Sequence, residues 1–224
     1  MKKLSLLFTK DGLQWHISKG KTVLEEAFYF VTEETSPHLV EEKLDDVLKF
    51  DDYKEIEVIS ALNHFSLTPD TFTEHELGYK LISYNAPVDE ANEELMLSVN
   101  KKFAVQFYYT FPKHFYQKIK AKKLPTKFNF SGEKFLNALT VKNHKEIHIN
   151  LYHHQVEFFA FENKKVVLYN NLDADSEVDF LYFIMFSLSK INFGTAETHF
   201  HIYGETHENE TFISELRKFV KNIK

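Results

Sequence analysis

The sequence predicts an α/β protein that contains two copies of one structural unit. Three short strands joined by tight turns open the chain, and a similar block of three strands follows at an offset of roughly 140 residues. A helical segment and then a lone strand follow each block. The two blocks cover Leu4–Thr9, Leu13–Ser18 and Thr22–Val31, and then Glu146–Tyr152, Val156–Phe161 and Val166–Leu172. A duplicated half-domain explains this order better than a solenoid, whose repeats are much shorter.

The strands of each block should pair in a fixed way. Turns as short as Lys10-Asp11-Gly12 and Lys19-Gly20-Lys21 join antiparallel neighbours. The lone strands, Glu55–Ala61 and Thr198–Gly204, come after a helix, and a helical crossover joins parallel neighbours. We therefore expect two mixed sheets, each with three antiparallel strands that continue into a parallel strand.

The two helices that precede the lone strands differ in character. The first begins at Ser36-Pro37, with serine as the N-cap and proline at the first helical position. The second, Asp175–Ile191, is apolar nearly all round, which predicts burial on most of its surface. We place it at the interface between the two halves and expect Phe183, Met185 and Phe186 to be largely buried.

Further elements separate and follow the repeated blocks. They are a helix that begins near Pro69-Asp70, a hairpin over Met96–Phe111, a helix over Lys113–Lys122, a strand over Lys127–Phe130, a helix from Ser131 to Val141 and a last helix over Glu210–Asn222. We assign residues 1–80 to the first half and residues 145–224 to the second half. Residues 81–144 form an insertion that completes the first half.

Composition limits the possible functions. The chain has 224 residues, of which 43% are apolar, so it can bury a sizeable core. The absence of cysteine excludes disulfides, zinc–thiolate sites and cysteine nucleophiles. The formal charge of −6, with Arg217 as the sole arginine, argues against nucleic-acid binding. The apolar run Leu4–Phe8 is too short for a signal peptide, and no segment has transmembrane length, so we expect a cytoplasmic protein without membrane contact.

In element order, the chain resembles the actin-like ATPase superfamily, whose halves have the ribonuclease-H-like fold. More specifically, it resembles a bacterial family classed as a domain of unknown function with that fold. The resemblance covers nearly the whole length and implies that the first turn of each half cradles a phosphate. Such a loop needs glycine for close backbone approach and a carboxylate to anchor a cation. By this resemblance, Asp11 and Gly12 would belong to a phosphate loop and Gly204 to the adenosine loop.

These loops are degenerate. Asp-Gly is also a common hairpin signal, and a positive φ at Gly12 would explain the first turn without any ligand. The second turn, Tyr152-His153-His154-Gln155, contains neither aspartate nor glycine. Gly204 is followed by Glu205, which would repel a nucleotide phosphate. We therefore expect no bound cofactor, no ATP binding and no ATP hydrolysis.

Histidines form a second group of candidates. Strand alternation and the expected strand order predict that four polar residues share one sheet face: His148, Asn150, His199 and His201. Imidazoles so placed could bind a metal ion or titrate near neutral pH. Acidic residues occur only at the strand ends, as Glu146 and Glu197, which weakens the case for a metal. We expect these groups to bond to one another or to water, and we keep His148, His199 and His201 as candidate ligands.

One aromatic segment could contact a partner. On a strand, Phe107 and Tyr109 face one way while Gln106 and Tyr108 face the other. The first face fits a core, and the second, with an exposed Tyr108, has the composition of an interface centre. We expect most of these rings to pack in the core and keep a partner surface as the alternative.

We interpret the chain as a non-catalytic, actin-like pseudo-ATPase that serves as a cytoplasmic interaction or scaffold protein, with a protein partner or a homodimer as its assembly. One alternative is a nucleotide- or metal-binding enzyme that uses a remodelled cleft between the halves, lined by Asp11, His148 and His201. A second alternative is an RNA-associated protein. The lysines for that role are Lys118, Lys120, Lys122 and Lys123.

Overall fold

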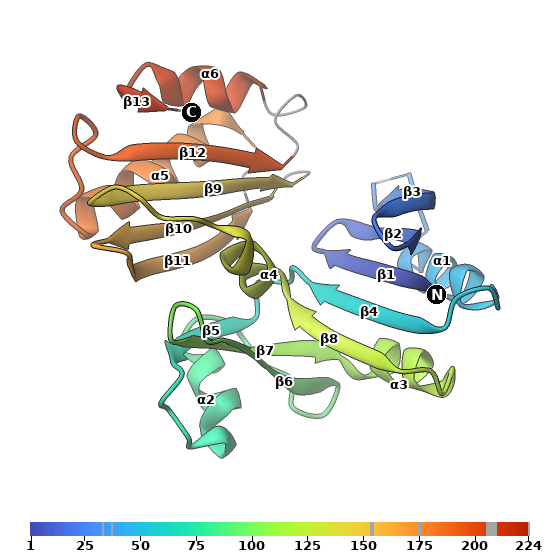
Figure 1. The fold of residues 1–224 in the computed structure, drawn as a ribbon. Helices are drawn as coiled ribbons and strands as arrows, with labels where there is room; N and C mark the ends of the chain where they lie inside the picture. The colour runs from blue at the N-terminus through green and yellow to red at the C-terminus, as the bar shows by residue number, and fades with distance from the viewer. Residues whose placement is uncertain (33, 37, 153–154, 174–175, 205–209, 224) are drawn as a thin grey trace. The chain divides into compact units, whose positions relative to one another are not determined.

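The computed structural model describes residues 1–32, 34–36, 38–152, 155–173, 176–204 and 210–223 (Figure 1). The chain divides into two compact units, residues 1–134 and residues 135–224, and each is described by itself. The boundaries inferred from the sequence, 1–80, 81–144 and 145–224, stay a prediction.

The first unit contains a five-stranded mixed sheet with strand order β3-β2-β1-β4-β8. Its strands are β1 (Lys2–Thr9), β2 (Gly12–Lys19), β3 (Thr22–Phe30), β4 (Glu55–Ser60) and β8 (Thr126–Phe130). The first three strands pair antiparallel, and β1–β4 and β4–β8 pair parallel. Alternating apolar residues of β1 and β2, such as Leu4, Leu6 and Leu13, are fully buried on one face.

The second unit repeats this arrangement with strand order β11-β10-β9-β12-β13. Its strands are β9 (Lys145–Tyr152), β10 (Gln155–Glu162), β11 (Lys165–Asp173), β12 (His199–Gly204) and β13 (Asn222–Ile223). Again three strands pair antiparallel, and β9–β12 and β12–β13 pair parallel. The predicted duplication and mixed sheets are confirmed. The sequence predicted one long helix over Glu210–Asn222, of which only α6 (Glu210–Arg217) forms, and the two-residue strand β13 begins at its last residue.

One stripe of side chains on helix α5 (Glu177–Lys190) packs against the five-stranded sheet of the second unit. Phe180, Ile184 and Leu188 recur every fourth residue and are buried, which is the spacing of a single helix face. The helix has the N-cap Ser176, whose hydroxyl accepts a hydrogen bond from the Asp179 N–H at 3.2 Å. The predicted starting residue, Asp175, lies outside the described residues.

The prediction that this helix is buried on most of its surface, with Phe183, Met185 and Phe186 all largely buried, is wrong. Phe186 is 46% exposed, Tyr182 is 59% exposed, and Phe183 and Met185 are half-buried. Local hydrophobicity does not reveal how many elements cover a helix, and here one sheet face and α6 cover only part of it.

The first helix is shorter than predicted. Helix α1 (Leu39–Leu48) has His38 at its N-cap position. The predicted cap, Ser36, accepts a hydrogen bond from the His38 N–H at 3.1 Å, and Pro37 lies outside the described residues. Leu44, Val47 and Leu48 form the buried stripe of α1.

A second, three-stranded sheet completes the first unit, with strand order β5-β7-β6. Its strands, and the helices that precede or follow them in the chain, are β5 (Phe65–Pro69), the 3-10 helix η1 (His75–Leu77), α2 (Gly78–Ser83), β6 (Glu93–Asn100), β7 (Val105–Pro112) and α3 (Lys113–Ala121). Helix α4 (Ser131–Ala138) spans the boundary between the two units. The predicted hairpin corresponds to β6 and β7. Strand β5 was not predicted, and it ends where the sequence predicted a helix to begin.

Strand β7 is the central strand of this sheet, and side chains from other elements cover both of its faces. Tyr109 packs on Phe130, while Tyr108 packs on Phe72 and bonds to His75 Nδ1 at 2.5 Å through its hydroxyl. Tyr108 is only 1% exposed. The expected exposed tyrosine and the interface centred on it are therefore wrong.

Candidate functional site

Polar side chains of β9 and β12 lie on one face of the second unit's sheet. Along β9, Ile147, Ile149 and Leu151 point into the core, so Glu146 and His148 point to the opposite face. Strand β12 runs parallel to β9 in a register that sets His199 opposite Glu146, His201 opposite His148 and Tyr203 opposite Asn150. Polar side chains of both strands therefore gather on the same face.

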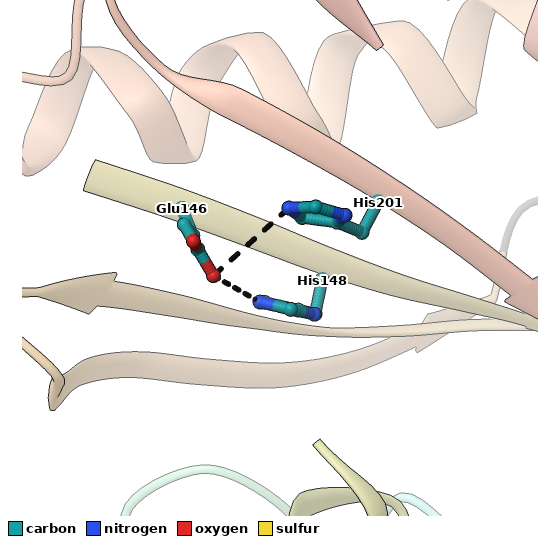
Figure 2. Close-up of side chains that lie close together, drawn as sticks. All are labelled: Glu146, His148 and His201. Carbon is teal, nitrogen blue, oxygen red and sulfur yellow. Dashed lines mark hydrogen bonds and ion pairs between the residues drawn. The ribbon is translucent and has the colours of Figure 1, made fainter. Parts of the chain in front are cut away.

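Glu146, His148 and His201 lie close together on this face, near the start of β9 (Figure 2). Oε2 of Glu146 is 2.7 Å from Nε2 of His148 and 3.9 Å from Nε2 of His201. The two imidazole rings stack, with centroids 4.6 Å apart and planes inclined by 15°. The side chains of Glu146 and His148 are each 1% exposed, while that of His201 is 20% exposed.

The carboxylate of Glu146 is held firmly through its other oxygen. Oε1 accepts hydrogen bonds from the backbone N–H of Lys142 at 2.9 Å, the backbone N–H of Asn143 at 2.5 Å and the Asn143 side-chain amide at 2.6 Å. Burial raises the pKa of Glu146, but the bonds from Asn143, His148 and Lys142 outweigh it, so the pKa lies below its ordinary value. Glu146 is therefore ionised at neutral pH.

His148 connects Glu146 to Tyr203. Its Nε2 faces the Glu146 carboxylate, and its Nδ1 is 3.1 Å from the Tyr203 hydroxyl. Burial lowers the pKa of His148 more than the bond to Glu146 raises it, so the ring is neutral at neutral pH. Because a carboxylate accepts, the proton of the neutral ring sits on Nε2, and the Tyr203 hydroxyl donates to Nδ1. Burial and the charge of Glu146 raise the pKa of Tyr203, which keeps this hydroxyl protonated.

A pocket of about 410 Å³ opens at this cluster. Its lining residues are Ala138, Thr140, Lys142, Asn143, Glu146, His201 and Tyr203. Small molecules or ions in this pocket could therefore reach both the Glu146 carboxylate and the His201 ring.

The structure brings two of the three predicted histidines together. His148 and His201 share the cluster, whereas His199 is not one of its members. Asn150 bonds instead to Glu157, a fully buried carboxylate that also accepts from the hydroxyls of Tyr152 and Tyr169. Sequence reasoning had discounted Glu146 because it stands at the strand end. Its position two residues before His148, which places both on one face, was the signal that could have identified it.

The first unit carries an ion-pair cluster at the corresponding positions. Register sets Glu57 opposite Ser5 there, as it sets His201 opposite His148 in the second unit. Lys3, two residues before Ser5, bonds to Glu57 at 2.5 Å, and Lys134 bonds to it at 2.7 Å. The first unit thus neutralises its carboxylate with two lysines, whereas the second unit places its carboxylate beside two imidazoles.

Sequence comparison identifies the family. The family described as "Protein of unknown function (DUF3822)" matches residues 1–223. The chain belongs to that family. A comparison with curated proteins returns no significant match.

Solved structures show which fold the DUF3822 chain adopts. A Bacteroides thetaiotaomicron VPI-5482 protein, described as having an actin-like ATPase fold and unknown function, is similar with a TM-score of 0.82 and 21% identity, over 99% of this chain and 89% of that one. The type IV pilus biogenesis complex PilM–PilN matches with a TM-score of 0.61 and 9% identity, over 99% and 87%. The cytoplasmic domain of EpsL, an inner membrane component of the Vibrio cholerae type II secretion system, matches with a TM-score of 0.54 and 8% identity, over 100% and 85%. The DUF3822 chain has the actin-like ATPase fold.

In this DUF3822 structure, both glycines of the predicted nucleotide loops make close contacts with neighbouring strands. A Cβ on Gly12 would lie 1.9 Å from the Tyr29 carbonyl oxygen, and a Cβ on Gly204 would lie 2.2 Å from that of Leu151. Gly204 has a φ of +83°, but Gly12 does not have the positive φ expected from its turn. Asp11 is half-buried, and its carbonyl accepts a hydrogen bond from the Val31 N–H at 2.6 Å. The predicted residues His153, His154 and Glu205 lie outside the described residues.

Among the described residues of this DUF3822 chain, no helix combines the length and the apolar character needed to cross a membrane.

Proposed function

We propose that this DUF3822 protein is a pseudo-ATPase: an actin-like fold that acts as an interaction or scaffold protein without binding or hydrolysing ATP. The observation that supports this most directly is the packing of its two loop glycines. A phosphate loop uses glycine to bring backbone N–H groups close to the ligand. Here a strand carbonyl occupies the space beside Gly12 and another occupies the space beside Gly204. Strand packing therefore explains both glycines without a nucleotide.

The side chains that flank the second turn also argue against a phosphate chain. Asn150, Tyr152 and Tyr169 all donate to the fully buried carboxylate of Glu157. A polyphosphate placed beside this carboxylate would meet electrostatic repulsion, which is strong where water is excluded. The Asn150 amide and the hydroxyls of Tyr152 and Tyr169 already donate to Glu157. They could not bind a ligand without leaving that carboxylate unsatisfied.

Two kinds of support favour a role in protein assemblies. The structures of similar fold include PilM–PilN, which is itself a complex, and EpsL, a component of a secretion system. In addition, β3 is the end strand of its sheet in the described part of the chain and exposes apolar side chains, with Val23 and Leu24 each 49% exposed and Phe28 52% exposed. End strands and clustered apolar side chains are common contact surfaces for other proteins.

Nucleotide binding is the decisive test. We expect no change in melting temperature when ATP and Mg²⁺ are added at millimolar concentration, no heat of binding in titration calorimetry and no release of phosphate. A ligand present at about 100 times its dissociation constant would stabilise the fold by about 2.7 kcal/mol, which a melting experiment detects readily. The dissociation constant for a protein partner should likewise be the same with and without ATP.

The matched control is Asp11→Ala, which removes the carboxylate that an active loop would use to hold a cation. A rise in melting temperature with ATP and Mg²⁺ that this substitution abolishes would contradict the proposal. It would instead favour a nucleotide-binding enzyme.

A further inference from the structure

We propose that Glu146, His148 and His201 form a binding site for a divalent transition-metal ion, and that Zn²⁺ fits these ligands well. One carboxylate and two imidazoles are a common ligand set for zinc sites that keep an open position. Imidazole nitrogen also suits other first-row ions, whereas Mg²⁺ and Ca²⁺ prefer oxygen ligands alone. This site lies within the second unit, and none of its three ligands is a residue of the predicted nucleotide loops.

The distances between the ligand atoms are close to those of an occupied site. One ligand atom from each of the three residues lies within 4.8 Å of the others. With bonds of about 2.0–2.2 Å, the ligand atoms of a tetrahedral zinc ion stand roughly 3.3 Å apart. The separations of 2.7 Å and 3.9 Å from Glu146 Oε2 lie on either side of this value. A change of less than about 1 Å in each of these two separations would bring the Glu146 oxygen to ligand spacing from both rings.

Binding would also require one imidazole to turn. An ion bound by two histidines lies near the plane of each ring, but the rings of His148 and His201 are stacked almost parallel. His148 is fixed between Glu146 and Tyr203, so it cannot turn without breaking both bonds. His201 lines the pocket and its side chain is 20% exposed, so it is the ring with room to rotate.

The surroundings of the ligands match those of known metal sites. Metal-binding histidines almost always make a hydrogen bond through their second ring nitrogen, and metal-binding carboxylates are themselves hydrogen-bonded. His148 has the Tyr203 hydroxyl at its Nδ1, and Glu146 has the Lys142 and Asn143 donors at its Oε1. When the ion replaces the proton on Nε2, that proton can reside on Nδ1 and be donated to the Tyr203 oxygen. His148 therefore stays neutral, and binding through it releases no proton.

Charge gives an independent reason for a cation here. In the first unit, Glu57 is neutralised by Lys3 and Lys134. In the described part of the chain, the Glu146 carboxylate lies beside the imidazoles of His148 and His201 instead. A bound ion would supply at Glu146 the positive charge that the lysines supply at Glu57.

Titration of tag-free, chelator-treated protein with Zn²⁺ tests this proposal. We expect one ion per chain to bind with saturation, and Co²⁺ in its place to give the visible absorption of a tetrahedral nitrogen- and oxygen-bound ion. His201→Ala should weaken the affinity more than about tenfold. His199→Ala is the matched control, because it removes an imidazole from the same strand and face and should leave the affinity unchanged. The control matters because the chain has 12 histidines that could bind zinc loosely.

Two results would overturn the proposal: the absence of saturable binding at one ion per chain, or an equal loss of affinity in His199→Ala and His201→Ala. Circular dichroism of each variant establishes that it is folded. Should His201→Ala fail to fold, His201→Gln keeps most of the side-chain volume and is expected to show the same loss. Because neither ATP nor Asp11 enters this experiment, its failure would leave the pseudo-ATPase proposal standing.

Discussion

Replacement of Glu57 by glutamine tests the electrostatic reasoning used for both units. The substitution keeps the shape of the side chain and removes its charge. Glu57 accepts hydrogen bonds from Lys3 at 2.5 Å and from Lys134 at 2.7 Å, and its side chain is only 11% exposed. The variant would leave both lysines without their carboxylate, so we expect Glu57→Gln to lower the free energy of unfolding at neutral pH.

The pKa of Glu57 sets the size of this effect. Burial raises the pKa, but the bonds from Lys134 and Lys3 overcome it and lower the pKa from 4.5 to about 2. At 1.36 kcal/mol per unit, this shift corresponds to an upper limit of about 3 kcal/mol. The lysine side chains are 34% and 42% exposed, and screening by water reduces the expected loss to about 1–2 kcal/mol.

The dependence on pH has a definite sign. A folded-state pKa below the unfolded value means that this stabilisation is fully present above about pH 4.5 and is lost as the pH falls toward 2. Urea unfolding of both proteins at pH 7, 4 and 3 measures the difference between them. We expect more than half of that difference to disappear by pH 3.

A difference between wild type and Glu57→Gln that stays constant from pH 7 to pH 3 would refute the reasoning. Asp46→Asn provides the control, because Asp46 forms a surface pair with Lys49 at 2.9 Å and is exposed. That variant should show no measurable loss at any of these pH values.

Two further predictions concern packing. Gly12→Ala should lower the free energy of unfolding in urea by more than about 2 kcal/mol, because the new Cβ would meet the Tyr29 carbonyl. Gly20→Ala should cost only about 1 kcal/mol, because Gly20 has a φ of +61° but open space around it. Equal losses in the two variants would show that strand β3 moves aside to make room for the Cβ at Gly12. Phe180→Ala should cost about 3–5 kcal/mol because Phe180 is fully buried, and Phe186→Ala, at the exposed face of α5, should cost less than about 1 kcal/mol. A loss of several kcal/mol from Phe186→Ala would show that something covers this face in solution.

Much of the candidate site was predictable because strand periodicity reports directly which residues share a face. The alternation of Ile147 and Ile149 with His148 placed the histidine opposite the core side. The repeated element order then predicted that β9 and β12 are neighbours, which brings His148 and His201 together. Strand alternation also places Glu146 on this face, but it could not show how the carboxylate is held there, because its Lys142 and Asn143 donors belong to the connection before β9.

The sequence by itself therefore determined the duplicated plan, the pairing direction of the main strands and the residues on each face of β9 and β12, because these follow from local periodicity and turn length. The tertiary structure alone decided which faces are covered. Tyr108 is buried because α2 packs over a strand that is already central in its sheet, and Tyr182 is exposed because nothing in the described chain packs on that side of α5. It also decided the role of Gly12. Glycine is needed there because β3 lies too close for a side chain, and not because the backbone has a positive φ. Coverage and close approach depend on contacts between residues far apart in the chain, which no local pattern records.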